Sequence, residues 1–144
     1  MSKHEPFLDA LRKAGHRITP QRRLICEYLT TTAEHPTPSV VYSALATQHP
    51  EISRATVYNT LSVLHELGVI VQIDLGDDHT HYETNLAPHV NLICRCCRRV
   101  IDFEPLDAPD AFLASLQRSS QFLPTTVHVQ VLGLCHECQL QESQ

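Results

Sequence analysis

The stretch SRATVYNTL, residues 53–61, decides the fold of the first half of the chain. Ser53 is a residue type that caps helix N-termini, and the apolar residues after it recur at helical spacing. We therefore expect a helix over Arg54–Leu67, ended by Gly68, that buries one face. The residues of that buried face are Val57, Leu61, Leu64 and Leu67.

The opposite face of this helix carries Arg54, Thr56 and Tyr58, with Asn59 beside them. In the major groove of DNA, Tyr58 could contact thymine methyl groups and Arg54 could contact guanine or phosphate. Arg17, ahead of the second predicted helix, could enter the minor groove. The alternative is an ordinary solvated helix face, and the helix alone does not decide between the two.

The elements around this helix favour a winged helix-turn-helix. Helices are predicted at Lys3–Ala14, after Thr19-Pro20 and after Thr37-Pro38, because Thr is a cap and Pro suits the first helical position. Val69–Leu75 and His79–Thr84 follow as a hairpin, with Gly76-Asp77-Asp78 as its turn. We assign residues 1–84 to this DNA-binding domain and residues 85–89 to a hinge.

Residues 90–144 predict a small α/β domain. Val90–Ile93, Val100–Phe103 and Thr126–Leu134 are expected strands, and Pro109–Ser119 is an expected short helix. A sheet of this size buries little by itself, so pairing with a second copy of the chain is expected. The fold class is α+β, with a winged helix followed by an α/β dimerisation domain.

Two C-x-x-C pairs give the strongest chemical signal. Cys94 with Cys97 and Cys135 with Cys138 can complete a tetrahedral four-thiolate site, which is typical of structural zinc. A thioredoxin-like redox motif would need only one pair, and four thiolates leave no open position for a zinc enzyme. The remaining cysteines are Cys96, either an outward loop residue or a reactive thiol, and Cys26, expected in the helical core.

The charge distribution and the apolar segments of the chain indicate which class of protein it belongs to. The chain of 144 residues has a formal net charge of −5, yet Arg12, Lys13, Arg17, Arg22 and Arg23 form a basic patch without an acid among them. An acidic chain can bind DNA through such a patch. No stretch suits a membrane helix and the first residues lack a signal-peptide core, so a cytoplasmic location is expected.

Taken together, these segments resemble the ferric uptake regulator (Fur) family of bacterial metalloregulators. The resemblance rests on segments that run in the family's order over nearly the whole chain. They are GHRITPQR (15–22), HPTP (35–38), SRATVYNTL (53–61), HVNLIC (89–94) and the two cysteine pairs. Residues 35–37 and 100–103 are closest to the peroxide-responsive repressor (PerR-like) branch.

The resemblance implies a homodimer that binds an inverted-repeat operator and holds a regulatory metal between its domains. Carried over by position, the ligands of this metal are His35, Glu83, His89 and Asp102. The family places a histidine where this chain has Asn91, whose amide oxygen is a weaker ligand. The candidates for a substitute ligand are His79, His81 and His128.

We therefore predict a metal-dependent transcriptional repressor that is not an enzyme. Its structural metal would be Zn²⁺, and its regulatory metal Fe²⁺ or Mn²⁺, which suit nitrogen and oxygen ligands. By analogy with the PerR-like branch, the signal would be peroxide in oxidative stress. The alternatives are a Fur-family sensor of zinc, nickel or manganese, and a thiol-based redox regulator that uses Cys96.

Overall fold

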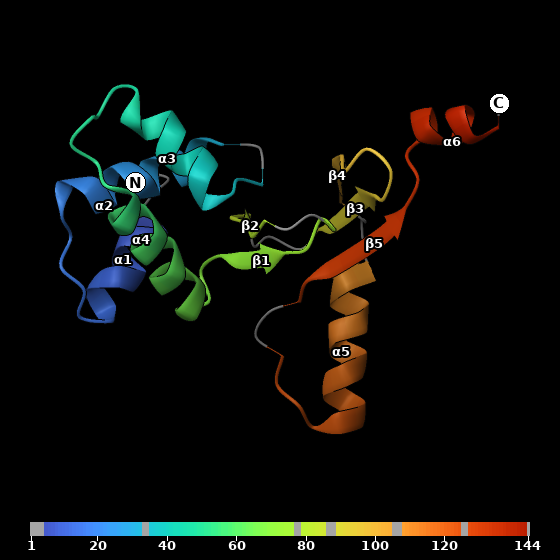
Figure 1. Cartoon of the computed structure of the whole chain (residues 1–144). Helices are drawn as coiled ribbons and strands as arrows, with labels where there is room; N and C mark the ends of the chain where they lie inside the picture. The colour runs from blue at the N-terminus through green and yellow to red at the C-terminus, as the bar shows by residue number, and fades with distance from the viewer. Residues whose placement is uncertain are drawn as a thin grey trace. The chain divides into compact units, whose positions relative to one another are not determined.

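The structure is a computed structural model that describes residues 5–32, 35–76, 79–85, 89–104, 108–124 and 127–143. The chain forms two compact units, Met1–Asn85 and Leu86–Gln144, which are described separately (Figure 1). Among the described residues, no helix is both long and apolar enough to cross a membrane.

The first unit begins with four helices whose starts follow the predicted signals. They are α1 (Glu5–Lys13), α2 (Pro20–Thr31), α3 (Pro38–Ala46) and α4 (Arg54–Glu66). The side chains of Thr19, Thr37 and Ser53 each accept a hydrogen bond from the backbone N–H three residues later. These caps satisfy backbone donors that a helix end leaves without an intrahelical partner. The predicted start of α1 at residue 3 lies outside the described residues.

The helices pack around one apolar core. Leu11, Ile25, Val57, Leu61 and Leu64 are completely buried in it. Cys26 belongs to this core as predicted, and burial raises the pKa of its thiol to about 12.

The prediction that Leu67 belongs to the buried face of α4 is wrong. Its side chain is 37% exposed, because α4 ends at Glu66 and Leu67 is already the cap residue. Gly68 follows with a φ of 75°, in the left-handed region that favours glycine, so the chain turns away from the helix axis there.

A two-stranded antiparallel hairpin completes the first unit. It consists of β1 (Val71–Ile73) and β2 (His81–Glu83), both shorter than predicted. The side chain of Asp74 accepts a hydrogen bond from the N–H of Gly76, 2.7 Å away, so the turn begins directly after β1. Of the predicted turn residues, 77 and 78 lie outside the described part. Four helices followed by this hairpin have the element order of a winged helix.

The second unit contains a three-stranded sheet and two helices. The strands are β3 (Val90–Cys94), β4 (Val100–Phe103) and β5 (Val129–Gly133), in the order β4-β3-β5. β3 is antiparallel to β4 and parallel to β5, so a crossover that contains α5 (Ala108–Ser120) joins β4 to β5. The chain ends with α6 (His136–Glu142), a seven-residue helix that the sequence patterns did not predict. β5 begins at Val129, three residues after the predicted Thr126, which is not described.

The strand register places one polar row between two apolar rows of the sheet. Asn91 lies level with Asp102 on β4 and with Gln130 on β5, so these three residues form a polar row. The neighbouring register positions carry only apolar side chains. We call these the apolar sheet face: Val90, Leu92, Ile101, Phe103, Val129 and Val131.

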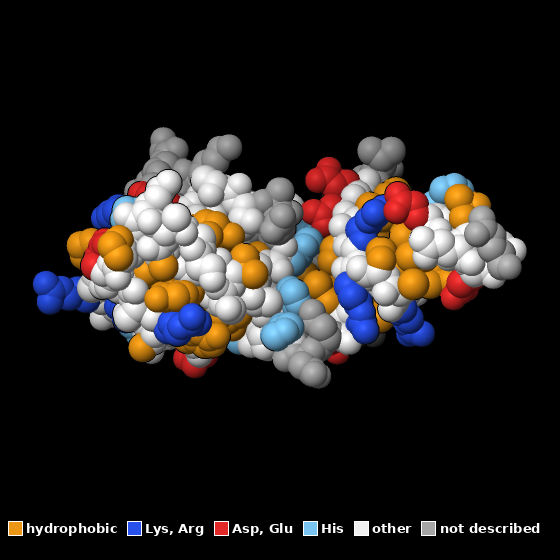
Figure 2. Space-filling model, turned by 45° about the horizontal axis from the view of Figure 1, so that its top comes forward, with side chains coloured by type: hydrophobic (Ala, Val, Ile, Leu, Met, Phe, Trp, Pro, Cys, Tyr) orange, Lys and Arg blue, Asp and Glu red, His pale blue; other side chains and the backbone are white. Residues whose placement is uncertain are grey.

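The apolar sheet face is largely open to solvent within the chain. Its edge-strand residues Ile101, Phe103 and Val131 are 43%, 54% and 49% exposed. Figure 2 shows apolar side chains standing among charged ones on the surface of the second unit. A groove of about 300 Å³ runs between Leu92, Ile101 and Val131 and reaches Cys135.

Candidate metal centres and nucleic-acid interface

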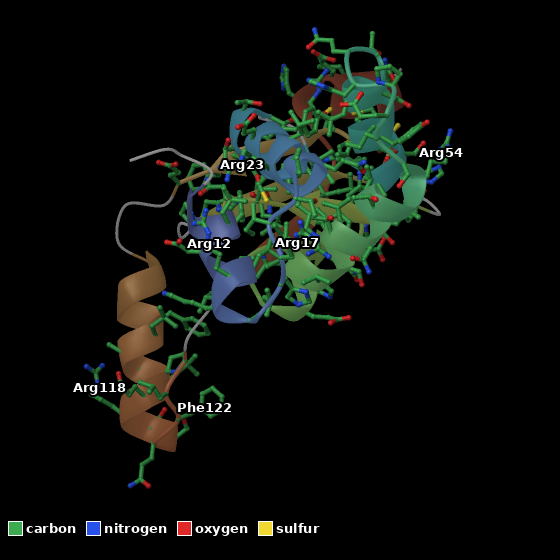
Figure 3. The ribbon with its side chains drawn as sticks, turned by 90° about the vertical axis from the view of Figure 1, so that its left-hand side faces the viewer. Arg12, Arg17, Arg23, Arg54, Arg118 and Phe122 are labelled. Carbon is green, nitrogen blue, oxygen red and sulfur yellow. The ribbon has the colours of Figure 1, made fainter. Side chains whose placement is uncertain are left out.

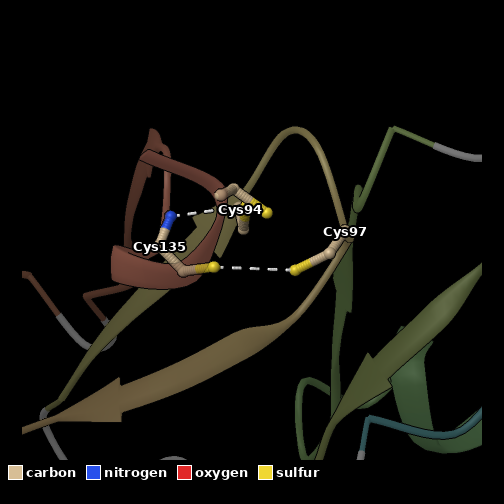
Figure 4. Close-up of side chains that lie close together, drawn as sticks. Cys94, Cys97 and Cys135 are labelled. Carbon is tan, nitrogen blue, oxygen red and sulfur yellow. Dashed lines mark hydrogen bonds between the residues drawn. The ribbon is translucent and has the colours of Figure 1, made fainter. Parts of the chain in front are cut away.

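The four cysteines of the two C-x-x-C pairs converge at one end of the sheet in the second unit. Cys94 is the last residue of β3, and Cys97 lies in the turn that leads to β4. Cys135 is the N-cap residue of α6, and Cys138 lies on its first turn. Figure 4 shows Cys97 and Cys135 facing each other, with Cys94 beside the backbone of Cys135.

The spacing of the four sulfur atoms fits a zinc ion. They all lie within 4.8 Å of one another, and the Sγ atoms of Cys97 and Cys135 are 3.8 Å apart. A tetrahedron with Zn–S bonds of about 2.3 Å has S···S edges of about 3.8 Å. The donor set and its geometry therefore suit a closed four-thiolate site.

The protonation of this cluster favours a bound cation. Backbone N–H groups of Cys135 and Cys97 point at the sulfur of Cys94 and lower the pKa of its thiol to about 6. The pKa of Cys138 is raised instead, because its thiol hydrogen bonds to Cys135 and is buried. Four adjacent thiolates repel one another, so a divalent cation is needed to ionise them all at neutral pH.

Cys96 does not belong to this four-sulfur cluster, and its side chain is exposed on the turn between Cys94 and Cys97. His136 is exposed as well. An exposed ion pair between Arg99 and Glu137, 3.0 Å long, links the turn after β3 to α6. This ion pair is a second link between the two segments that carry the cysteines, in addition to the contacts between the cysteines themselves.

In the first unit, His35 and Glu83 meet although 48 residues separate them. Nε2 of His35 lies 2.5 Å from Oε2 of Glu83, and both side chains are almost completely buried. The other carboxylate oxygen of Glu83 accepts a hydrogen bond from the backbone N–H of Asn85 at 2.8 Å. The carboxylate is thereby held toward the imidazole, and the pair offers one nitrogen and one oxygen donor.

The wing strand β2 holds the segment of His35 in place. The N–H of Tyr82 donates to the carbonyl of Pro36 at 3.0 Å, and Nδ1 of His81 lies 2.8 Å from the carbonyl of His35. Because a carbonyl can only accept, the Nδ1 of His81 carries the proton and its lone pair is on Nε2. His79 lies before β2 and is exposed, whereas His81 is half-buried.

The remaining predicted ligands lie in the second unit near its polar row. His89 and Asn91 are 8% and 0% exposed, whereas Asp102, level with Asn91 on β4, is exposed. Nε2 of Gln130 lies 3.0 Å from Nε2 of His128. Gln130 lies two residues after His128, on β5, and was not among the sequence candidates.

The predicted DNA-contacting residues are on the surface of the first unit. Arg17, Arg54, Tyr58 and Asn59 are exposed, and Tyr58 is 49% exposed despite its aromatic ring. Thr56 is half-buried, and its hydroxyl lies 2.8 Å from that of Ser53, so it contributes to the cap of α4. Figure 3 shows Arg12, Arg17 and Arg23 around α1 and α2 and Arg54 at the edge of the unit.

Arg22 connects two parts of this surface, a role that the sequence did not reveal. Its guanidinium donates to the carbonyl of Arg17 at 2.6 Å and to Oδ1 of Asn59 at 3.5 Å. The segment before α2 is thereby held against α4. A groove of about 670 Å³ lies between the first turns of these two helices.

Comparison with known proteins now decides the family, because the model of the ferric uptake regulator family matches residues 13–131. The chain belongs to the Fur family. It is 36% identical to the peroxide-responsive repressor PerR of Staphylococcus epidermidis over 136 residues, which are 93% of this chain and 89% of that protein.

Solved structures agree with this assignment. PerR from Streptococcus pyogenes superposes with a TM-score of 0.54 at 31% identity, over 96% of this chain and 95% of that one. Fur from Pseudomonas aeruginosa, solved with manganese, gives a TM-score of 0.78 over 94% and 99%, and at 22% identity it shows the shared fold.

The family confirms the broad prediction made from the sequence. This Fur-family protein is a metal-dependent, PerR-like transcriptional repressor and not an enzyme. Fur-family regulators bind DNA operators as dimers and bind metal ions.

We expect Cys138→Ser to abolish tight zinc binding by this Fur-family protein, because a neutral hydroxyl replaces one of four thiolates. Zinc content by atomic absorption should fall from one ion per chain toward zero. Cys96→Ser is the matched control, since Cys96 lies outside the cluster, and it should retain the full zinc content. Equal zinc loss in both variants would contradict this assignment.

Proposed function

We propose that the chain is a homodimeric repressor that binds its operator only when a regulatory metal ion is held by His35, Glu83, His89 and Asp102. The observation that carries the proposal is the contact between His35 and Glu83, which brings an imidazole nitrogen and an oriented carboxylate together. The four-cysteine cluster would hold a second, structural Zn²⁺.

The donor set favours Fe²⁺ or Mn²⁺ at the regulatory site. Imidazole and carboxylate ligands suit these ions, and the absence of a thiolate from the proposed ligands argues against a dedicated zinc sensor. Zinc binds such ligands more tightly, so the supply of each ion in the cell decides occupancy. A sensor of zinc, nickel or manganese remains the alternative proposal.

Asn91 cannot replace a histidine ligand on equal terms, because its neutral amide oxygen is a weaker donor. His81 is the substitute that the local contacts support best. Its Nδ1 donates to the carbonyl of His35, so its Nε2 lone pair can coordinate a metal. His79 and His128 are weaker candidates, since His79 is exposed ahead of β2 and His128 contacts Gln130.

The proposed ligands come from both units of the chain, which explains how metal binding could control DNA binding. When bound, the ion supplies a bond between ligands of the two units. Helices α4 of a dimer must then be about 34–36 Å apart, or a multiple of that, to read two half-sites. Moving such an equilibrium from 1:99 to 99:1 takes about 5.5 kcal/mol of differential binding.

In the proposed complex, α4 reads the major groove through Tyr58, Arg54 and Asn59, with Thr56 at its first turn. Arg17 follows the minor groove, and the contact from Arg22 to the carbonyl of Arg17 holds it in position relative to α4. The exposure of Tyr58 leaves its ring accessible to the thymine methyl groups of the proposed complex.

We expect operator binding by the zinc-loaded protein to require a second ion. Duplex DNA selected from an inverted-repeat library should bind at least about tenfold more tightly when Mn²⁺ or Fe²⁺ is added, as measured by fluorescence anisotropy. Titrations of the same protein with Zn²⁺ and Ni²⁺ show whether either of these ions promotes operator binding, as the alternative sensors require.

Glu83→Gln should remove this metal response, because an amide replaces the oriented carboxylate. Glu66→Gln is the matched control, since Glu66 is an exposed residue at the end of α4, and it should behave as the wild type. Equal affinity for DNA with and without the second ion would sink the proposal.

We further propose that peroxide is the signal. Support comes from the 36% identity to a peroxide-responsive repressor and from the imidazole ligands. Bound Fe²⁺ would supply the electron that starts cleavage of the peroxide O–O bond. Overall, one peroxide oxygen would enter an imidazole C–H bond and the other would leave as water. His35 and His89 are the side chains that would then be oxidised, and loss of a ligand would release the operator.

Mild peroxide treatment of the iron-loaded protein should therefore add one oxygen atom to the peptide that contains His35 or His89. Tandem mass spectrometry locates the added mass, and the manganese-loaded protein is the control without a reducing ion. Oxygen found only on Met1 or on cysteines would reject a histidine-based peroxide sensor and favour a redox role for Cys96.

The second unit provides the surface for the proposed dimer. The apolar sheet face ends in exposed edge strands, and a second copy of the chain would cover it. The interfaces of obligate dimers are as apolar as the interior of a domain. The valine, isoleucine and phenylalanine side chains of the apolar sheet face fit such an interface.

Val131→Asp should convert the dimer into a monomer, because the substitution places a carboxylate on the apolar sheet face. Size-exclusion chromatography with light scattering measures the mass, and a full zinc content shows that the fold is intact. Gln48→Asp, which adds the same charge to an exposed turn of the first unit, is the control and should stay dimeric. An unchanged dimer in Val131→Asp would exclude this face.

A further inference from the structure

Tyr42 and Arg54 form a stacked pair at the start of α4. The guanidinium carbon of Arg54 lies 4.3 Å from the centroid of the Tyr42 ring. Tyr42 belongs to α3 and packs partly against the helical core, whereas Arg54 is the first residue of α4 and is exposed. Figure 3 shows Arg54 projecting outward from the first unit. A partly buried ring therefore supports an exposed, charged side chain.

Stability within the chain does not explain an arginine at this position. The N-terminal end of a helix carries partial positive charge, which disfavours a cation there. The first turn of α4 contains no acidic residue, and none of the ion pairs among the described residues involves Arg54. Apart from its contact with the ring of Tyr42, the cation gains only when a ligand with acceptor atoms approaches the helix.

The stacking contact defines what Arg54 can recognise. A ring beneath the guanidinium fixes the plane of the group and leaves the N–H donors at its edge directed outward. A coplanar pair of acceptors, such as O6 and N7 of guanine, is read by two parallel hydrogen bonds and needs such a fixed plane. A phosphate contact depends mainly on charge, which a lysine supplies as well.

We propose that Tyr42 is a specificity-determining positioning residue, which holds the guanidinium of Arg54 in the plane that reads one guanine in each half-site. This inference rests on the proposed entry of α4 into the major groove. The N-terminal residues of a recognition helix are those that reach base edges, and Arg54 is the first residue of α4. Tyr42 acts through Arg54 and does not itself touch the base.

The experiment uses the full-length protein loaded with Zn²⁺ and Mn²⁺ and a library of duplexes with a randomised inverted repeat. Bound duplexes are sequenced for the wild type and for five variants: Tyr42→Leu, Tyr42→Phe, Arg54→Lys, Arg54→Gln and Tyr58→Ala. Tyr42→Phe is the matched control, because it keeps the aromatic ring. Zinc content and the urea midpoint show whether each variant is folded.

The wild type and Tyr42→Phe should select a guanine at one symmetric position of each half-site. Tyr42→Leu and Arg54→Lys should lose at least about tenfold of this preference, while the other positions and the salt dependence of binding stay the same. Arg54→Lys keeps the positive charge, so the loss would identify the planar contact as the cause. It also tests the inference independently if Tyr42→Leu fails to fold.

Two results would overturn the inference. An unchanged guanine preference in folded Tyr42→Leu would show that the ring does not position Arg54. A uniform loss of affinity for all duplexes in Arg54→Gln, with a salt slope lower by about one per protomer, would identify a phosphate contact instead. Tyr58→Ala distinguishes the proposed function from this inference, since it should weaken binding whatever Tyr42 does. If no variant and no wild-type protein binds any duplex, both fail together.

Discussion

The convergence of four sulfur atoms at one end of the sheet is the constraint on which the second unit depends. Apart from Ile93, the buried apolar side chains of its described residues are Cys94, Cys135 and Cys138. A core this small cannot offset the conformational entropy of ordering the segment. Zinc binding of about 10–16 kcal/mol in small zinc domains is comparable to the whole stability of a typical domain. The bound ion would therefore supply much of the stabilisation that a hydrophobic core supplies in a larger domain.

The same constraint fixes the alignment of the strands, and with it the positions of the proposed regulatory ligands. Cys94 ends β3 and Cys135 follows β5, so joining them holds these parallel strands in register. Asn91, Asp102 and Gln130 then lie level with one another, and a slip of one residue would move each to the opposite face. The four-cysteine site would thus help to fix the row that carries the proposed ligand Asp102, although the two sites share no residue.

The sequence predicted most helices and the four-cysteine cluster because their signals are local. Thr19-Pro20, Thr37-Pro38 and Ser53 each specify a helix start through a hydrogen bond within three residues. The contact of His35 with Glu83 spans 48 residues, and only the family resemblance placed both in one site. The exposure of Leu67 and the existence of α6 escaped prediction. The first depended on one residue at a helix end, and the second on a seven-residue segment without an apolar stripe.

The charge of the chain explains why directional contacts matter for its recognition of DNA. With a net charge of −5, the protein gains less from the phosphate backbone than a basic protein does, so its non-specific affinity should be low. Discrimination must then come from groups with fixed orientation at the DNA surface. Arg22 holds Arg17 against α4 through a carbonyl and an amide, and Tyr42 holds Arg54 through its ring. In both cases a neighbouring side chain removes conformational freedom before DNA arrives, so less entropy is lost on binding. An acidic repressor can in this way be selective without first accumulating on unrelated DNA.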